Sequence, residues 1–251
     1  MSLVVFAASY VAFRAVTREL AVARLQSDFV AAVSHEFRTP LTAMCHLTEM
    51  LEQGDTKPER LSDYYRALGK ESRRLRTMVE NLLDFGRLDS GRCAYDFCET
   101  DAADLVDQVA QEFTDRSAAA GDRIERAPSP AGAVLIRADR EALTLALRNL
   151  VDNALKYSPD SSSIRVAVAA TNGTVAVSVE DHGPGVSADE RRAIFRKFTR
   201  GAAARSLNVK GTGIGLTMAN QIVKAHGGRL ELDSELGRGS IFTMVLPAMP
   251  R

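Results

Sequence analysis

Residues 29–44 read FVAAVSHEFRTPLTAM, and apolar side chains recur in this stretch every three or four residues. This spacing puts them on one face of an α-helix, and the pattern extends in both directions along the chain. The stripe comprises Val22, Leu25, Phe29, Val33, Phe37, Leu41, Met44, Leu47 and Leu51. His35 lies two residues from Val33 and from Phe37, about 200° round the helix from each, so we expect its imidazole to face water.

A second helix is predicted after a turn that contains Gly54 and Pro58. Its repeating positions, all apolar except one, are Leu61, Tyr64, Leu68, Glu71, Leu75, Met78, Leu82 and Phe85. Alternating steps of three and four residues are typical of a coiled-coil seam. Two antiparallel helices cannot bury such a seam alone, so the sequence predicts a homodimer in which two hairpins form a four-helix bundle.

From about Cys98 the pattern changes to mixed helices and strands. Helices are predicted over 101–119 and 140–156, and strands over 164–168, 175–179, 229–235 and 240–246. Asn172-Gly173 predicts a hairpin between two of the strands, and Gly237 with Gly239 predicts another turn. Helices on one face of a mixed sheet form an α/β sandwich. The predicted fold class is therefore multidomain α and α+β.

Composition narrows the choice of partner and compartment. The 251 residues balance 32 Lys and Arg against 32 Asp and Glu, so no basic field indicates a nucleic-acid partner. The odd number of cysteines, Cys45, Cys93 and Cys98, has no metal-ligand spacing and fits a reducing cytoplasm. We interpret all three as core residues.

The amino-terminal segment Leu3–Phe13 is uncharged and mostly apolar, and Arg14, Arg18 and Arg24 follow it. Such a flank is expected on the cytoplasmic side of a membrane helix. Eleven residues are fewer than the roughly 20 that span a bilayer. We interpret residues 1–16 as the remnant of a truncated transmembrane helix that would attach a cytoplasmic core to an inner membrane. An apolar patch at the start of a soluble helix is the alternative.

Residues 29–44 closely resemble the phosphoacceptor box of histidine kinases. The resemblance implies that His35 attacks the γ-phosphate of ATP, with Glu36 as general base, and a neutral imidazole is available for this near pH 7. It also implies that Thr39 positions a water that dephosphorylates the partner, although an ordinary helix-interior threonine is an equal reading. Pro40 removes one helical hydrogen bond, so we expect a kink one turn after His35.

The segment Leu147–Pro159 reads LRNLVDNALKYSP. Asn149 and Asn153 share a helix face because they are four residues apart, and Lys156 follows one turn later. With three further segments it resembles the ATP-binding fold of histidine kinases, gyrases, Hsp90 and mismatch-repair ATPases. The resemblance implies that Asn153 holds Mg²⁺, that Asn149 lies near the phosphates, and that Lys156 and Tyr157 lie near the nucleotide. Taken alone, such an asparagine pair is common on exposed helices.

The second segment of this set is Glu180–Val186, EDHGPGV. A carboxylate that ends a strand can accept a hydrogen bond from the adenine amino group, and glycines let the backbone approach the base closely. By resemblance Asp181 is the adenine anchor, with Gly183 and Gly185 beside it. An acidic β-turn is the alternative for this segment in isolation.

The third segment, Ile194–Phe198, and the small polar residues up to Lys210 resemble the aromatic box and the lid over ATP. Phe198 is assigned to ATP binding by this resemblance, while Phe195 fits a core position better. The fourth segment opens a helix with glycines, a suitable cradle for phosphates. Its predicted ATP-binding residues are Lys210, Gly211, Thr212, Gly213, Gly215 and Leu216. It is not a dinucleotide fingerprint, because no strand precedes it immediately.

The ordered set of motifs resembles the catalytic core of a two-component sensor histidine kinase. We therefore expect a dimerisation and phosphotransfer hairpin over 17–93 and a catalytic ATP-binding domain over 94–251. The expected activity is ATP-dependent autophosphorylation of His35, with ATP and Mg²⁺ as cofactors, and transfer to an aspartate of a response regulator receiver domain. The alternative is a phosphatase-dominant protein or a pseudokinase scaffold that acts on the same regulator.

Overall fold

A computed structural model describes residues 2–53, 60–90, 94–117, 123–130, 132–159, 162–171, 173–199 and 212–249. Its contacts divide the chain into two compact units, one formed mainly by the residues up to Leu82 and the other beginning at Leu83. Each unit is considered by itself. Several positions used in the sequence predictions lie outside the described residues: Pro58, Cys93, Asn172, the residues of the expected lid, Lys210 and Gly211.

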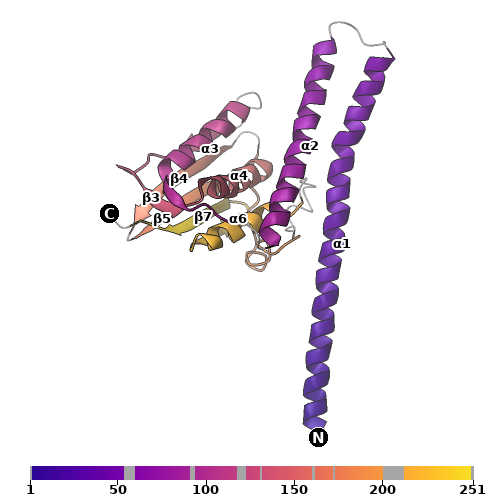
Figure 1. Ribbon diagram of the computed structural model, residues 1–251, viewed down its shortest axis with the longest axis vertical. Helices are drawn as coiled ribbons and strands as arrows, with labels where there is room; N and C mark the ends of the chain where they lie inside the picture. Colours follow the sequence, from indigo (N-terminus) through magenta and orange to yellow (C-terminus); the bar gives the residue numbers. More distant parts are fainter. Residues whose placement is uncertain are drawn as a thin grey trace. The chain divides into compact units, whose positions relative to one another are not determined.

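The first unit is a helical hairpin (Figure 1). Helix α1 spans Ser2–Glu52 and runs through Pro40, and helix α2 spans Leu61–Asp89. The apolar segment Leu3–Phe13 forms the beginning of α1. No helix in the described part of the chain combines the length and the apolar character needed to cross a membrane. The bounds of α1 and α2 confirm the two predicted helices.

The apolar positions of the predicted seam are mostly half-buried in a single chain. Leu61, Leu68 and Leu75 are of intermediate exposure, and Phe85 at the end of the series is buried. Leu41 departs from the prediction, because its side chain is 54% exposed. Pro40 takes the buried position instead, and the next residue lies about 100° further round the helix.

The second unit contains a five-stranded sheet in the order β2-β4-β5-β7-β6. Its strands are β2 (Arg123–Arg126), β4 (Ser163–Thr171), β5 (Thr174–Asp181), β6 (Arg229–Glu235) and β7 (Gly239–Pro247). The pair β2 and β4 is parallel, and the other pairs are antiparallel. A separate antiparallel pair joins β1 (Cys98–Asp101) to β3 (Leu135–Ala138).

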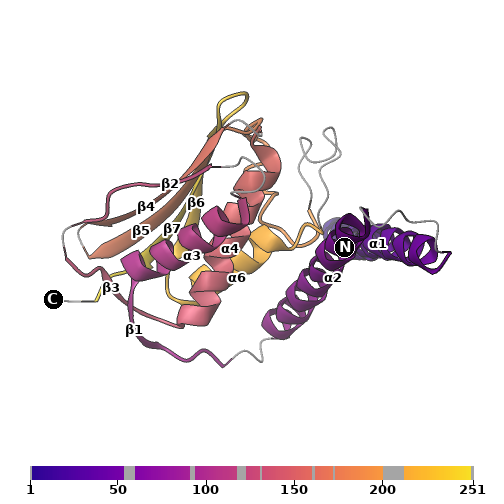
Figure 2. The ribbon, with the colours of Figure 1, turned by 90° about the horizontal axis from the view of Figure 1, so that it is seen from above.

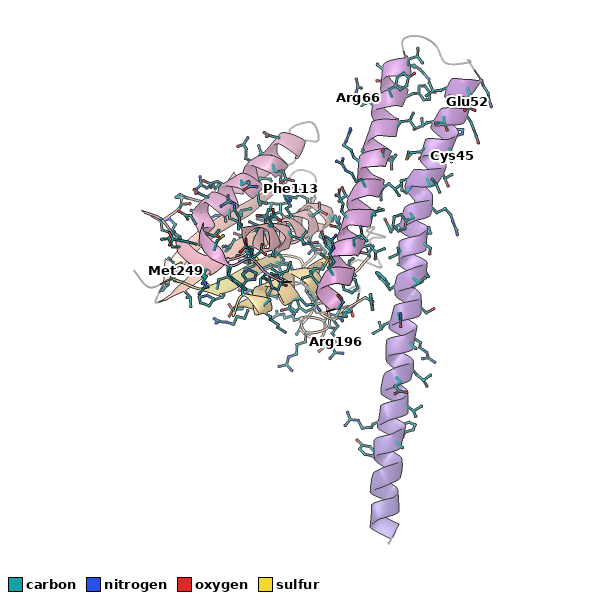
Figure 3. The ribbon with its side chains drawn as sticks, in the orientation of Figure 1. Cys45, Glu52, Arg66, Phe113, Arg196 and Met249 are labelled. Atoms are coloured by element: carbon teal, nitrogen blue, oxygen red, sulfur yellow. The ribbon has the colours of Figure 1, made fainter. Side chains whose placement is uncertain are left out.

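Helices α3 (Ala102–Ser117), α4 (Arg140–Tyr157) and α6 (Gly215–Ala225) cover one face of this sheet (Figure 2). Alternate residues of β5, from Val175 to Val179, turn toward the helices and are buried. Phe113 of α3 fills the core between the layers and is 2% exposed (Figure 3). The unit is the two-layer sandwich that the sequence predicts.

Two sequence interpretations need correction. Cys45 and Cys98 are exposed free thiols rather than core residues, and Cys45 lies on α1 (Figure 3). Strands β1, β2 and β3 were not predicted, since each has only four residues. A run that short gives almost no alternation of polar and apolar residues.

The turn between β6 and β7 brings the backbone close to the end of β5, where Asp181 pairs with Ser240. Gly239 has φ +106, and a Cβ there would lie 1.9 Å from the carbonyl oxygen of Asp181. Gly237 has φ +79 but no atom within 4 Å of the equivalent position. Gly239 is therefore required both by its positive φ and by the lack of space for a side chain, whereas Gly237 is favoured by its φ alone.

Gly239→Ala should lower the free energy of unfolding by about 3 kcal/mol or more, because it adds a backbone clash to the strain of a positive φ. Gly237→Ala is the matched control and should cost about 1 kcal/mol, from the strain alone. Urea unfolding followed by circular dichroism measures both. Equal losses in the two variants would contradict the close approach at Gly239.

Candidate functional site

The predicted phosphoacceptor lies on α1 with its imidazole exposed, as the stripe requires. His35 shares a surface recess along α1 with other side chains of the same helix: Arg38, Thr39, Thr42, Ala43 and His46. Because the ring faces outward and is not packed in the hairpin seam, a phosphate donor can reach one of its nitrogens.

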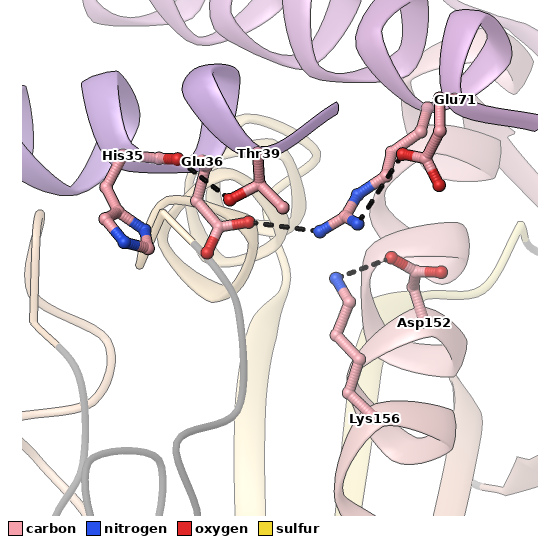
Figure 4. Close-up of polar contacts among 7 residues, drawn as sticks. His35, Glu36, Thr39, Glu71, Asp152 and Lys156 are labelled. Atoms are coloured by element: carbon pink, nitrogen blue, oxygen red, sulfur yellow. Dashed lines mark hydrogen bonds and ion pairs between the residues drawn. The ribbon is translucent and has the colours of Figure 1, made fainter. Parts of the chain in front are cut away.

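Glu36 has a different environment from its neighbour. It is 7% exposed, and its Oε2 accepts a hydrogen bond of 3.3 Å from Nη2 of Arg74 on α2 (Figure 4). Nη1 of Arg74 lies 3.9 Å from Oε2 of Glu71. Two carboxylates from different helices therefore share one guanidinium. The structure ties the predicted general base to Arg74 within the hairpin.

Thr39 and Pro40 modify the backbone one turn after the histidine. The Thr39 hydroxyl donates to the carbonyl oxygen of His35 over 3.3 Å (Figure 4). Pro40 has no N–H, so the helix cannot supply the usual donor for the carbonyl of Glu36. The predicted kink stays a prediction, as does the role of Thr39.

In the second unit, α4 carries the predicted asparagine motif. Asn149 donates from Nδ2 to the carbonyl of Leu145 over 2.9 Å, and its Oδ1 lies 2.7 Å from where a Cβ of Gly215 would be. The start of α6 therefore packs directly on Asn149, and a larger residue at position 215 would force the Asn149 side chain to move. The asparagine motif of α4 and Gly215, the last glycine of the fourth segment, therefore meet at this contact.

The next turns of α4 carry Asn153 and Lys156. Nζ of Lys156 lies 2.8 Å from a carboxylate oxygen of Asp152, an exposed ion pair (Figure 4). Within the described residues, the side chain of Asn153 makes no hydrogen bond, and it is of intermediate exposure. A neutral amide oxygen in this position suits a hard cation such as Mg²⁺, which retains several waters and bridges phosphates.

Asp181 ends β5 and is 5% exposed. Its Oδ1 accepts from the backbone N–H of Gly183 over 2.8 Å, and the Ser240 N–H is a second donor. Burial raises the pKa of this carboxyl, and the backbone hydrogen bonds oppose the shift. A buried acceptor that is held by backbone donors can select an amino group on a planar ligand.

The two predicted glycines beside Asp181 both contact backbone. A Cβ on Gly183 would lie 2.9 Å from the carbonyl oxygen of Tyr157, so the end of α4 touches this loop. Gly185 has φ +72, and a Cβ there would lie 2.1 Å from the carbonyl oxygen of Glu235. The structure therefore brings Tyr157, Asp181 and Gly183 together.

The aromatic and glycine segments are only partly described. Phe195 packs against Phe242 at 6.4 Å, as expected for a core residue. Phe198 has φ +64, and its ring meets that of Phe85 edge-on at 5.7 Å. Leu216, a predicted ATP-binding residue, is half-buried against the hydrophobic core. Thr212 and Gly213 are of intermediate exposure, with φ +73 at the glycine.

Sequence reasoning missed the residues that support Asp181 from β7. Ser240 lies opposite it in the sheet and Gly239 lies against its carbonyl oxygen, and no local motif marks either as part of a site. It also missed the buried His226, which accepts a hydrogen bond from the backbone N–H of Asp139 over 3.0 Å. The only available signal was the glycine pair that follows this histidine.

Two family models match the chain. Residues 25–91 match the His Kinase A (phospho-acceptor) domain, and residues 138–250 match the histidine kinase-, DNA gyrase B- and HSP90-like ATPase family. Both matches contain the predicted motifs, with His35 in the first and the asparagine motif and Asp181 in the second.

Named relatives agree with these matches. The sensor-like histidine kinase SenX3 of Mycolicibacterium smegmatis is 33% identical over 226 residues, which cover 89% of this chain and 58% of that protein. A structure of full-length ShkA in complex with AMPPNP is 30% identical, with TM-score 0.62, and the match covers 88% of this chain and 46% of the other.

The structure of histidine kinase ThkA in complex with the response regulator TrrA has the same fold. It has TM-score 0.65 at 22% identity, over 93% of this chain and 64% of that one. The chain spans about half the length of the curated relatives it matches. With both domain types present in one chain, the protein belongs to the two-component sensor histidine kinases and carries their phosphoacceptor and ATP-binding parts.

Proposed function

We propose that this chain autophosphorylates His35 with ATP and passes the phosphoryl group to an aspartate of a response regulator receiver domain. A ring nitrogen of His35 attacks the γ-phosphorus, an N–P bond forms, the bond to the β–γ bridging oxygen breaks, and ADP leaves. The observation that carries the proposal is the exposed His35 in a chain whose second unit gathers Asn149, Tyr157, Asp181 and Gly183 around α4.

ATP fits the second unit by its donor and acceptor pattern. Asp181 would accept from the adenine amino group, and Gly183 leaves room beside it. Asn149, Lys156 and the glycines up to Gly215 would lie toward the phosphates. Asn153 would hold Mg²⁺, which neutralises phosphate charge when bound.

Glu36 would act on His35 as general base only when its carboxylate is not committed to Arg74. The ion pair supports a resting state of the hairpin in which the Glu36 carboxylate is bound to Arg74 and is not available as a base. Thr39, one turn later, would position the water that removes phosphate from the receiver, as its motif implies.

The receiver domain as partner is supported by the crystallised complex of ThkA with its response regulator. The surface recess on α1 is where such a domain would reach His35. The phosphohistidine N–P bond breaks as the aspartate O–P bond forms. A pseudokinase scaffold is not favoured, since relatives such as SenX3 and AfsQ2 are named histidine kinases.

A homodimer is supported by apolar side chains that the hairpin leaves uncovered. Val30, Leu41, Tyr65 and Val79 are between 42% and 63% exposed on the two helices. Val30 and Leu41 are 11 residues apart and Tyr65 and Val79 are 14 apart, so each pair lies on one face of its helix. An apolar face of this kind is unfavourable unless a second surface covers it. A second copy of the hairpin would complete a four-helix bundle.

We also propose a location for this chain in the cell. The apolar segment Leu3–Phe13 and the arginines after it support a catalytic core on the cytoplasmic side of an inner membrane.

Incubation with γ-labelled ATP should give acid-labile label on the wild type and none on His35→Gln, because the acceptor nitrogen is absent. His46→Gln is the matched control, since His46 lies on the same helix and lines the same recess; it should keep its label. Label on His35→Gln, or none on the wild type, would contradict the proposal.

Asn153→Ala should remove most of the gain in ATP affinity that Mg²⁺ provides, because the amide ligand is lost. Titration calorimetry in Mg²⁺ and in EDTA measures this gain, and the affinity in EDTA should change by less than about twofold, under 0.5 kcal/mol. Gln111→Ala, an amide removed from α3, is the control. A full Mg²⁺ effect in Asn153→Ala would refute the assignment.

Val79→Asp should weaken the dimer at least tenfold, about 1.4 kcal/mol, because it places a charge in the apolar contact. Thr77→Asp adds the same charge at an exposed polar position of α2 and should leave the dimer intact. Sedimentation equilibrium distinguishes them. Equal effects, or a monomeric wild type, would count against the bundle.

A further inference from the structure

The residues between α2 and β1 form the connector from the phosphoacceptor helices to the ATP-binding part. Its last side chains lie against one buried histidine, His226. The ring of Tyr95 meets the imidazole edge-on at 5.3 Å, and the ring of Phe97 lies 4.9 Å from it. The two aromatic rings are 5.9 Å from each other. The three rings form a cluster, which we name the connector latch.

The imidazole of His226 is fixed from both sides. Its Nε2 lies 3.0 Å from the backbone N–H of Asp139, and its Nδ1 lies 2.8 Å from the carbonyl oxygen of Ile222. A backbone N–H only donates and a carbonyl only accepts, so Nε2 is the acceptor and Nδ1 carries the hydrogen. The ring is 6% exposed and has one orientation in which both bonds form.

Asp139 connects the same cluster to the connector backbone. Its Oδ1 accepts from the N–H of Ala142 over 3.0 Å and so caps the start of α4. Its Oδ2 accepts from the N–H of Asp96 over 3.0 Å. One carboxylate therefore holds both the connector and the helix that carries the asparagine motif.

The latch joins the C-terminal end of α6 to the N-terminal end of α4, and these two helices form the proposed ATP site. His226 ends α6, whose first residue, Gly215, packs on Asn149 in the second half of α4. Asp139 begins α4. The two helices are thus joined at two places. Gly215 at the start of α6 packs on Asn149, and His226 after the end of α6 accepts a hydrogen bond from the N–H of Asp139.

We propose that His226 is a positioning residue for phosphoryl transfer, which fixes the connector to α4 and α6 and so sets the orientation in which bound ATP meets His35. This inference rests on the proposed function. With the latch closed, Tyr95–Phe97 move together with α4 and α6.

Opening the latch would release Tyr95–Phe97 from α4 and α6. A longer free tether lowers the effective concentration of bound ATP at His35. Loss of a fixed approach direction lowers the rate further. ATP affinity should not change, because neither His226 nor Phe97 lies among the residues proposed to bind the nucleotide.

Three variants of the full chain test this. Phe97→Ala removes one ring from a residue that is already 38% exposed, so folding is not at risk. His226→Phe keeps a ring but loses both hydrogen bonds, and His226→Gln keeps an acceptor for the Asp139 N–H. The measurements are the single-turnover rate of His35 labelling at saturating ATP, the Kd for ATP, and hydrogen exchange of the Asp96 amide.

We expect Phe97→Ala and His226→Phe to slow labelling at least threefold, with the Kd for ATP unchanged within twofold and faster exchange at Asp96. His226→Gln should restore at least half of the lost rate. An unchanged or faster labelling rate in both Phe97→Ala and His226→Phe would overturn the inference. A rise in the Kd for ATP that accounts for the slower labelling would overturn it as well. Absence of label on the wild type would overturn the proposed function instead, so the two failures are distinguishable.

Discussion

The close approach of α4 to its neighbours is the constraint on which the ATP-binding part depends. Gly183 admits the backbone carbonyl of Tyr157 at a separation that a Cβ would not allow, and Gly215 admits the side chain of Asn149, which would have to move if a Cβ were present. These two contacts fix α4 against α6 and against the loop after β5. Because Asn153 lies on α4 between them, its position follows from packing that involves no ligand.

The sheet supplies the second fixed point. Asp181 is held by backbone donors from its own loop and from Ser240 on β7, so its carboxylate has a defined direction although it is buried. Preorganisation of this kind reduces what the protein must reorder when a nucleotide binds. Gly239 makes the arrangement possible by letting β7 begin beside the Asp181 carbonyl.

Local chemistry and periodicity predicted the helices, the long strands and the exposure of His35, because each extends over enough residues to show a period. The four-residue strands could not be found in this way. Nor could the pairing of Glu36 with Arg74, since it joins two helices that are separated by 38 positions in sequence. The cysteines were misplaced because residue type alone does not decide which side of a helix or sheet a residue occupies. Leu41 was misplaced because Pro40 takes the buried position that the stripe assigns to its neighbour.

The most direct test of the site is hydrogen exchange of the full chain with and without a non-hydrolysable ATP analogue and Mg²⁺. If α4 and the Asp181 loop form the nucleotide site, protection should increase at Asn153, Tyr157 and Gly183, while α3 around Phe113 stays unchanged. Protection confined to other segments, with these amides unaffected, would contradict the account.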